Sequence, residues 1–126
     1  MKLTVSKLNK FLLFKLPSAF FCGVRVKEID VNKCVVSVKH RWINQNPFNS
    51  MYFAVQAMAA ELSTGALVMF QIAKSGRKIS MLVAKNKRNF TKKATGRITF
   101  TCNDEKKKKK AILETIATGE GQTFWM

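Results

Sequence analysis

Residues 51–70 read MYFAVQAMAAELSTGALVMF, and this apolar stretch decides the fold. Apolar and small residues cover every side of a helix built from it, so the sequence predicts a helix buried on all sides. Glu61 is the only charged residue in the stretch. Because an ionised carboxylate in apolar surroundings is costly unless it is paired, hydrogen-bonded or protonated, Glu61 is the first candidate for a functional residue.

The same stretch is long enough to span a membrane. Gln56, Ser63 and Thr64 interrupt it, however, and Glu61 lies at its middle, where a charge is most costly to insert. We therefore expect a core helix and no membrane among the partners.

The N-terminal residues and the cysteines favour a cytoplasmic protein. Lys15 and Pro17 interrupt the apolar run of residues 11–14, which leaves it too short for a signal peptide. Cys22, Cys34 and Cys102 are odd in number, far apart and without metal-ligand spacing. We expect reduced core thiols and no metal site.

Periodicity on either side of residues 51–70 predicts the other elements. A helical stripe covers about residues 3–15, and two alternating stretches starting at Val24 and Cys34 predict a β-hairpin. In its second strand, one face is expected to hold Cys34, Val36, Val38, His40 and Trp42. Further elements are predicted as strands over 79–83 and 93–102, a short helix over 104–116 and an extended segment over 122–126. The order predicts a single α+β domain over residues 1–126, with an antiparallel sheet around the helix of residues 51–70.

The charge balance points to anionic partners. Lys and Arg number 23 against 7 acidic residues, which gives a formal net charge of +16. Nucleic acid, anionic lipid, a phosphate-bearing small molecule and an acidic carrier protein all fit such a charge. Nucleic acid is the least favoured, because the aromatic residues do not alternate with Lys and Arg on a strand face. The five-lysine run Lys106–Lys110 is interpreted as a solvated helix surface.

Short motifs around the long helix resemble hotdog-fold thioesterases. In the phenylacetyl-CoA branch an Asn and a Gly precede a His-Gly-Gly, and an acid follows seven residues after the second Gly. Asn46, Asn49, Tyr52-Phe53-Ala54 and Glu61 fall on those positions. Residues 46–49, 57–65 and 117–122 more closely resemble the uncharacterised thioesterase-like branch, a domain of unknown function. The resemblance covers about residues 17–126 and implies a hotdog fold, a curved antiparallel sheet wrapped around a long central helix.

Two departures from the family pattern stand out. Tyr52-Phe53-Ala54 replaces His-Gly-Gly, so side chains occupy space that glycine leaves open. Relatives of this kind also continue past a segment like residues 121–126 into a further strand. The last strand is therefore expected either to be truncated or to be missing from the sheet.

The resemblance implies a hydrolase that cleaves acyl-CoA or acyl-carrier-protein thioesters, as a homodimer or dimer of dimers. Glu61 is the expected base or nucleophile, and Asn46 and Asn49 would lie near the thioester of the neighbouring protomer. The amides of Phe53 and Ala54, at the positive end of the helix, are the expected oxyanion site. The expected substrate-binding residues are Ala57, Met58 and Gly65 beside Glu61, and Lys85, Lys87, Arg88 and Lys92 for the phosphates of coenzyme A. Coenzyme A enters as part of the substrate, and no cofactor is expected.

Simpler interpretations stay open for each candidate. Glu61 could be a satisfied buried acid bonded to Ser63, Thr64, an Asn or a partner-chain Arg, and the two asparagines could be helix caps. The basic loop could be merely solvated, and His40 a hydrogen-bonded structural histidine. For the whole protein, the alternatives are a non-catalytic hotdog protein that binds acyl thioesters and, less favoured, a nucleic-acid-binding protein.

Overall fold

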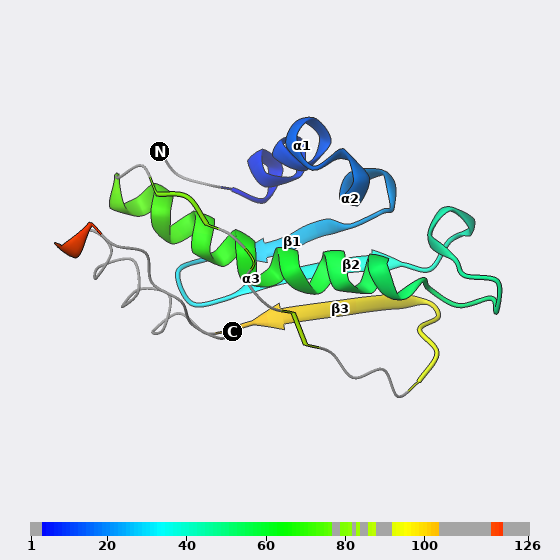
Figure 1. Ribbon diagram of the computed structural model, residues 1–126. Helices are drawn as coiled ribbons and strands as arrows, with labels where there is room; N and C mark the ends of the chain where they lie inside the picture. Colours follow the sequence, from blue (N-terminus) through cyan, green and yellow to red (C-terminus); the bar gives the residue numbers. More distant parts are fainter. Residues whose placement is uncertain are drawn as a thin grey trace.

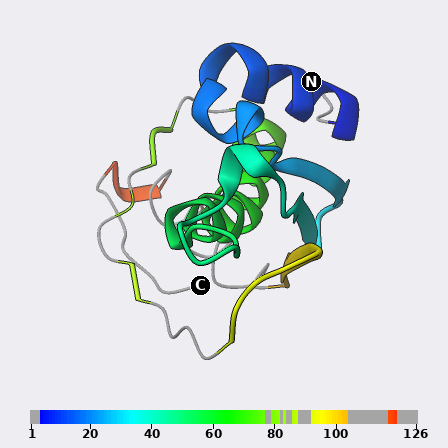
Figure 2. The same cartoon turned by 90° about the vertical axis from the view of Figure 1, so that its right-hand side faces the viewer.

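The computed structural model describes residues 4–76, 79–81, 83, 86–87, 92–103 and 117–119. Its elements are α1 (Val5–Lys15), α2 (Pro17–Phe21), β1 (Arg25–Ile29), β2 (Cys34–Lys39), the 3-10 helix η1 (Trp42–Asn44), α3 (Phe53–Ser75) and β3 (Arg97–Cys102). The strands form an antiparallel sheet in the order β1-β2-β3. α3 lies along one face of the sheet, and α1 and α2 lie beside β1 (Figure 1). The view along α3 shows the same arrangement (Figure 2).

α3 is the predicted central helix, with boundaries shifted toward the C-terminus. It begins at Phe53 instead of Met51, because Met51 is held in a bridge with Gln45 and its N–H donates to the Ala94 carbonyl at 2.8 Å. It ends at Ser75, and the following Gly76 adopts the left-handed conformation at φ 70° that commonly terminates helices. Its buried residues are Val55, Ala59, Leu62, Ser63, Gly65, Ala66, Leu67 and Val68.

By length and composition, α3 is also the one helix of the described part of the chain that could cross a membrane. Half of its most apolar 18-residue stretch is buried inside the fold. This burial against the sheet is in keeping with the expected core helix.

The sheet confirms the first three residues of the predicted apolar strand face. Cys34, Val36 and Val38 are buried and pair with Cys102, Phe100 and Ile98 of β3. The prediction was wrong for His40 and Trp42, since β2 ends at Lys39 and Trp42 lies in η1, where it is 83% exposed. The chain turns there because Asn44 accepts from the Arg41 N–H and donates to the Lys39 carbonyl, at 2.8 and 2.9 Å.

α1 packs its apolar stripe into the core and also covers the free edge of β1. Leu8 and Leu12 are buried in the same cluster as the sheet and α3. The Asn9 side chain donates to the Val26 carbonyl at 3.1 Å and accepts from the Val26 N–H at 2.9 Å. Pro17 ends α1 as predicted, but it also begins α2, which the sequence analysis missed.

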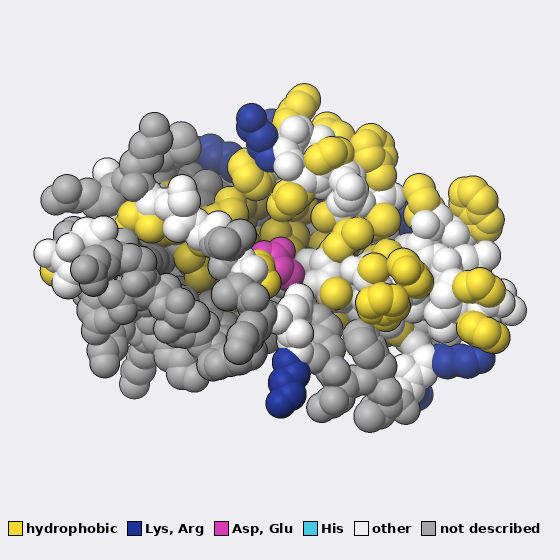
Figure 3. All heavy atoms as spheres, in the orientation of Figure 1, with side chains coloured by type: hydrophobic (Ala, Val, Ile, Leu, Met, Phe, Trp, Pro, Cys, Tyr) yellow, Lys and Arg dark blue, Asp and Glu magenta, His cyan; other side chains and the backbone are white. Residues whose placement is uncertain are grey.

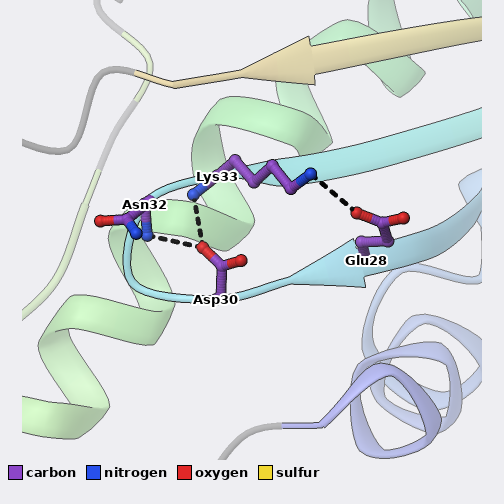
Figure 4. Close-up of polar contacts among 4 residues, drawn as sticks. All are labelled: Glu28, Asp30, Asn32 and Lys33. Atoms are coloured by element: carbon purple, nitrogen blue, oxygen red, sulfur yellow. Dashed lines mark hydrogen bonds and ion pairs between the residues drawn. The ribbon is translucent and has the colours of Figure 1, made fainter.

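The β1–β2 turn is held by acidic side chains. Asp30 Oδ1 accepts from the N–H groups of Asn32 and Lys33 at 2.7 and 2.9 Å, and the Lys33 ammonium contacts Glu28 at 3.1 Å (Figure 4). The turn predicted at residues 30–33 is therefore confirmed, with a bulge between Val26 and Glu28.

Other predictions are only partly covered by the described residues. The strand predicted from Ile79 is wrong for the described residues of this stretch, since Ile79, Ser80, Met81 and Val83 belong to no strand. The position beside β2 that a strand could take is occupied by β3. Residues 104–116 and 122–126 lie outside the described part of the chain. Cys34 and Cys102 are buried and Cys22 is half-buried.

Candidate functional site

The start of α3 presents backbone donors. Tyr52 is the N-cap, in an extended conformation without a side-chain cap, and its carbonyl accepts from the Val55 and Gln56 N–H groups. Helical geometry leaves the Ala54 N–H without an acceptor inside the helix, at the positive end of the helix dipole. This end of α3 is suited to binding an oxygen that carries partial or full negative charge.

Asn46 organises the loop before α3 through its side chain. Its Oδ1 accepts from the Phe48 N–H at 2.9 Å and from the Ser50 N–H at 3.3 Å, and its Nδ2 donates to Ser50 Oγ at 2.9 Å. Asn49 is exposed in the left-handed region at φ 58°, and its N–H donates to the Asn46 carbonyl. The helix-cap interpretation of the two asparagines was wrong, because the N-cap of α3 is Tyr52, and Asn46 instead orders the preceding loop.

The Glu61 carboxylate lies over Gly65, one turn further along α3. A Cβ on Gly65 would sit 3.0 Å from Glu61 Oε1 and 3.5 Å from the Met81 terminal methyl. Because Gly65 has no side chain, the Glu61 carboxylate and the Met81 methyl have room beside it. The Ser63 and Thr64 hydroxyls donate to the backbone carbonyls of Ala60 and Glu61, at 2.6 and 2.8 Å. Glu61 is half-buried, and the face along which α3 runs shows acidic atoms bordered by hydrophobic side chains (Figure 3).

Within one protomer the predicted base and the predicted oxyanion site are apart. Ala54 and Glu61 are seven residues apart on one side of α3, which corresponds to about 10 Å along the axis. The carboxylate also leans toward Gly65, away from the helix start. A reacting carbonyl must be within about 3 Å of both the activated water and the oxyanion donors. Within a single chain, the substrate carbonyl and the attacking water would have to span this separation to contact both groups.

The other predicted substrate-binding residues divide into two groups. Ala57 and Met58 are half-buried on α3 in the turn before Glu61, and Gly65 is buried in the turn after it. Lys87 and Lys92 are exposed, whereas Lys85 and Arg88 lie outside the described residues. The neighbouring Lys93 donates to the Phe48 carbonyl at 3.4 Å, so part of the basic segment runs beside the loop that precedes α3.

Exposed apolar side chains surround the start of α3, which the sequence analysis did not predict. We call this set the aromatic surface; it consists of Trp42, Ile43, Phe48, Tyr52 and Phe53. The Tyr52 and Phe53 rings make an edge contact with centroids 5.0 Å apart. Phe53 therefore points to the surface, and hydrophobic side chains gather at this end in Figure 3. The sequence feature that could have predicted this surface is the number of large apolar residues in the otherwise polar loop before α3.

Asn44 and His40 are two further polar residues near this end. Asn44 is buried, and its amide donates to the carbonyls of Cys22 and Lys39, both at 2.9 Å. Its own carbonyl accepts from the Tyr52 N–H, so this residue links α2, β2 and the start of α3. The His40 Nε2 atom is buried without a hydrogen-bond partner among the residues that the structure places. Those residues also contain no group of three His, Cys, Asp or Glu that could hold a metal ion.

An antiparallel curved sheet around a long central helix is the hotdog fold. The profile of the domain of unknown function DUF4442 matches residues 6–122, and the chain belongs to this family.

Two solved structures share the fold. A protein of unknown function from Chlorobaculum tepidum matches with a TM-score of 0.80 at 18% identity, over 94% of this chain and 76% of that one. A protein of unknown function from Pseudomonas aeruginosa, described as a probable thioesterase, matches with a TM-score of 0.69 at 20% identity, over 94% and 78%. No curated protein matches the chain.

Proposed function

We propose that this protein hydrolyses acyl thioesters of coenzyme A or of an acyl carrier protein. The observation that carries the proposal is the half-buried Glu61 carboxylate, which lies over Gly65 in a stretch of α3, residues 53–70, that has no other charge. The description of the Pseudomonas protein as a probable thioesterase supports the same reaction class. We further propose that the protein is cytoplasmic and works as a homodimer or dimer of dimers.

In the proposed reaction Glu61 acts as general base. It takes a proton from water, the water oxygen bonds to the thioester carbon, and the carbonyl oxygen becomes an oxyanion. The carbon–sulfur bond then breaks, and the proton held by Glu61 passes to the departing thiolate. The products are a carboxylic acid and a thiol. If Glu61 instead attacked the carbonyl directly, a single turnover in ¹⁸O-water would place label in the Glu61 side chain.

The separation along α3 supports a site shared between two protomers. Since about 10 Å lie between Ala54 and Glu61 of one chain, the donor for the oxyanion would come from the α3 start of the partner. The aromatic surface around that helix start provides apolar area for such an interface. Asn49 is exposed beside it and would approach the thioester of the neighbouring protomer.

Basic residues near the helix start suit the phosphates of coenzyme A. Lys92 is exposed next to Lys93, whose ammonium lies 3.4 Å from the Phe48 carbonyl. We propose that Lys92 and Lys87, with Lys85 and Arg88 from the same segment of the sequence, bind these phosphates as charge partners. The acyl chain would lie along α3, beside Ala57 and Met58.

The first experiment compares hydrolysis of short-, medium- and long-chain acyl-CoAs by the wild type and by Glu61→Gln. We expect kcat to fall at least about 100-fold, the usual effect of losing a general base. Glu28→Gln is the matched control, because it removes an exposed acid at the β1–β2 turn. Glu61→Gln turnover within twofold of the wild type would reject Glu61 as the base.

A mixed-dimer experiment tests the shared site. Ala54→Pro removes one backbone donor in the first helical turn, where proline is tolerated. Co-expressed Ala54→Pro and Glu61→Gln chains form dimers with one complete site only if the two groups come from different protomers. We expect each pure variant to be inactive and the mixed dimer to recover about half of the wild-type activity. If a verified mixed dimer stayed inactive, the Ala54 donor and the Glu61 base of each site would come from the same chain.

The second candidate is a hotdog protein that binds acyl thioesters without turnover. The observation that favours it is Tyr52-Phe53-Ala54 at the positions where the thioesterase pattern has His-Gly-Gly. Saturable acyl-CoA binding by calorimetry, together with no hydrolysis of any chain length, would establish this function instead.

A further inference from the structure

α1 and α2 carry large apolar side chains that do not pack into the core. Leu8 and Leu12 fill the inner side of α1, while Phe14 is 76% exposed and Phe21 is 61% exposed. Leu16 and Phe11 are exposed as well, at 41% and 37%. Both helices lie at the outer side of β1, away from β2 and β3 (Figures 1 and 2). Exposed apolar groups gathered on neighbouring elements usually mark a site of interaction.

Lysines alternate with these apolar residues on α1. Lys7, Lys10 and Lys15 are exposed, and positions 7, 10, 11 and 14 follow the spacing of three and four residues that places side chains on one side of a helix. We call these lysines, together with Phe11, Phe14, Leu16 and Phe21, the α1–α2 surface. It combines apolar and cationic groups on one outer layer of the molecule.

The charge of this region has a single sign. The first acidic residue of the sequence is Glu28, so residues 1–27 contain only basic charges: Lys2, Lys7, Lys10, Lys15, Arg25 and Lys27. The Arg25 guanidinium lies 3.7 Å from the centre of the Phe20 ring and donates to the Phe20 carbonyl at 2.7 Å. A partner for this surface must therefore bring negative charge and accept apolar side chains.

We propose that the α1–α2 surface binds the face of an anionic phospholipid bilayer. The phenylalanines and Leu16 would enter the boundary between headgroups and acyl chains, and the lysines would contact the anionic headgroups. The binding is peripheral, since Leu8 and Leu12 keep α1 attached to the core. The expectation of no membrane partner concerned a spanning helix at residues 51–70, whereas the exposure of these side chains on α1 and α2 is a property of the fold. The inference does not depend on the proposed thioesterase activity.

A second copy of the chain is a poorer partner. A two-fold interface places the same surface on both sides, so Lys7, Lys10 and Lys15 would face their own copies with no acidic residue of 1–27 to offset them. Single-stranded nucleic acid would satisfy the lysines and stack on aromatic rings, but it offers nothing to the aliphatic Leu16. A bilayer with anionic headgroups satisfies both kinds of side chain.

The test is co-sedimentation of the full chain with vesicles at about 0.15 M salt. One vesicle type is neutral phosphatidylcholine, and the other contains about 30% phosphatidylglycerol. We expect binding to the anionic vesicles only. Phe11→Ser/Phe14→Ser should weaken it at least tenfold, and each of Lys7→Gln and Lys10→Gln about fivefold, as expected for a lysine near anionic headgroups. Phe48→Ser is the matched control, since Phe48 is 72% exposed but belongs to the aromatic surface.

Thermal melts by circular dichroism check that each variant is folded. Four results would overturn the proposal: no binding of the folded wild type to anionic vesicles, equal binding to both vesicle types, equal weakening by Phe48→Ser, or a wild-type dimer that Phe11→Ser/Phe14→Ser converts to monomer without any vesicle binding. Displacement from vesicles by an equimolar single-stranded oligonucleotide would instead identify nucleic acid as the preferred partner of this surface.

Discussion

The buried side chain of Asn44 bonds the backbone of the segments that meet near the start of α3. It donates to two carbonyls, Cys22 and Lys39, and accepts from the Arg41 N–H. Asn44→Ala leaves all three backbone groups without their partner. We expect the free energy of unfolding to fall by about 3 kcal/mol, measured as a lower urea midpoint at unchanged m-value.

Gln45→Ala is the control for this variant, because Gln45 is the exposed neighbour of Asn44. A change below about 0.5 kcal/mol is expected for the control. Equal effects of the two substitutions would show that the Asn44 hydrogen bonds contribute little.

Gly65 tests the geometry around Glu61. A methyl group at this position would sit 3.0 Å from Glu61 Oε1, so Gly65→Ala must displace the carboxylate. Alanine also favours the helix by up to about 1 kcal/mol, which opposes any loss of stability. We expect kcat/KM to fall about tenfold while the urea midpoint changes little.

The double variant Glu61→Gln/Gly65→Ala makes this prediction specific. If Gly65→Ala acts by moving the carboxylate, it should add no further loss once the carboxylate has been removed. A tenfold loss in both backgrounds would mean that the methyl group obstructs the substrate instead.

At the level of residues, candidate functional residues could be predicted from the sequence better than the residues that make structural hydrogen bonds. Glu61 was visible because it is the only charge in an apolar stretch, and Gly65 followed from helical spacing. Asn44 and Asn9 could not be identified, because their partners at Cys22 and Val26 are brought near them only by the tertiary fold. The half-buried state of Glu61 does not decide its role, which stays a prediction.

At the level of elements, Asn9 closes the outer edge of β1. Its side chain bonds both the N–H and the carbonyl of Val26, as a neighbouring strand would. Asn9→Ala leaves both groups unpaired, and we expect a loss of about 2 kcal/mol in the free energy of unfolding. Amide hydrogen exchange at Val26, followed by NMR, should accelerate more than at Val36.

Ser6→Ala serves as the control on the same helix, because Ser6 is exposed and the hydrogen bonds to Val26 come from Asn9. Unchanged protection of Val26 in Asn9→Ala would indicate that water or another group replaces the amide. Aggregation confined to Asn9→Ala would agree with an opened strand edge.

Element boundaries were predicted less well than the elements themselves, for local reasons. The apolar run predicted α3, but Met51 is withdrawn from it by pairing with Gln45 and Ala94. Alternation continued to Trp42 in the sequence, but β2 stops at Lys39, where Asn44 turns the chain. α2 was missed because Pro17 was interpreted only as the end of a helix, although proline is equally common at the beginning of one.

At the level of the whole molecule, charge is unevenly distributed. Lys39 and Arg97 are paired across β2 and β3, and Arg25 and Arg41 lie near the same end of the sheet. Glu28, near the end of β1, and Asp30, in the β1–β2 turn, lie at the opposite end. Burial lowers the pKa of Arg25, and the charge of Arg41 lowers it further. The basic end of the sheet therefore carries unfavourable charge repulsion.

The dependence of Tm on salt concentration measures this repulsion. Arg25 is charged at neutral pH in both the folded and the unfolded chain, so its lowered pKa produces no pH dependence of stability near pH 7. Salt screens the repulsion, and we expect Tm to rise between about 0.01 and 0.3 M KCl. Arg41→Gln should raise Tm by about 2 °C at the lower concentration and reduce the rise with salt.

Arg41→Lys retains the positive charge and is the control for Arg41→Gln. It should behave as the wild type in both salt concentrations. A salt-independent Tm in the wild type would show that the positive charges are too far apart to repel one another appreciably.

The bonding of Asn9 to the β1 edge also affects which edge of the sheet can pair with another strand. Of the two outer edges of the described sheet, the one at β1 has its Val26 groups bonded to Asn9, which favours the addition of a strand beyond β3. If two sheets joined edge to edge through β3, the β1 edges would lie at the outer ends of the dimer and no third chain would be added. A single asparagine on α1 thereby favours a finite pair over an open fibre.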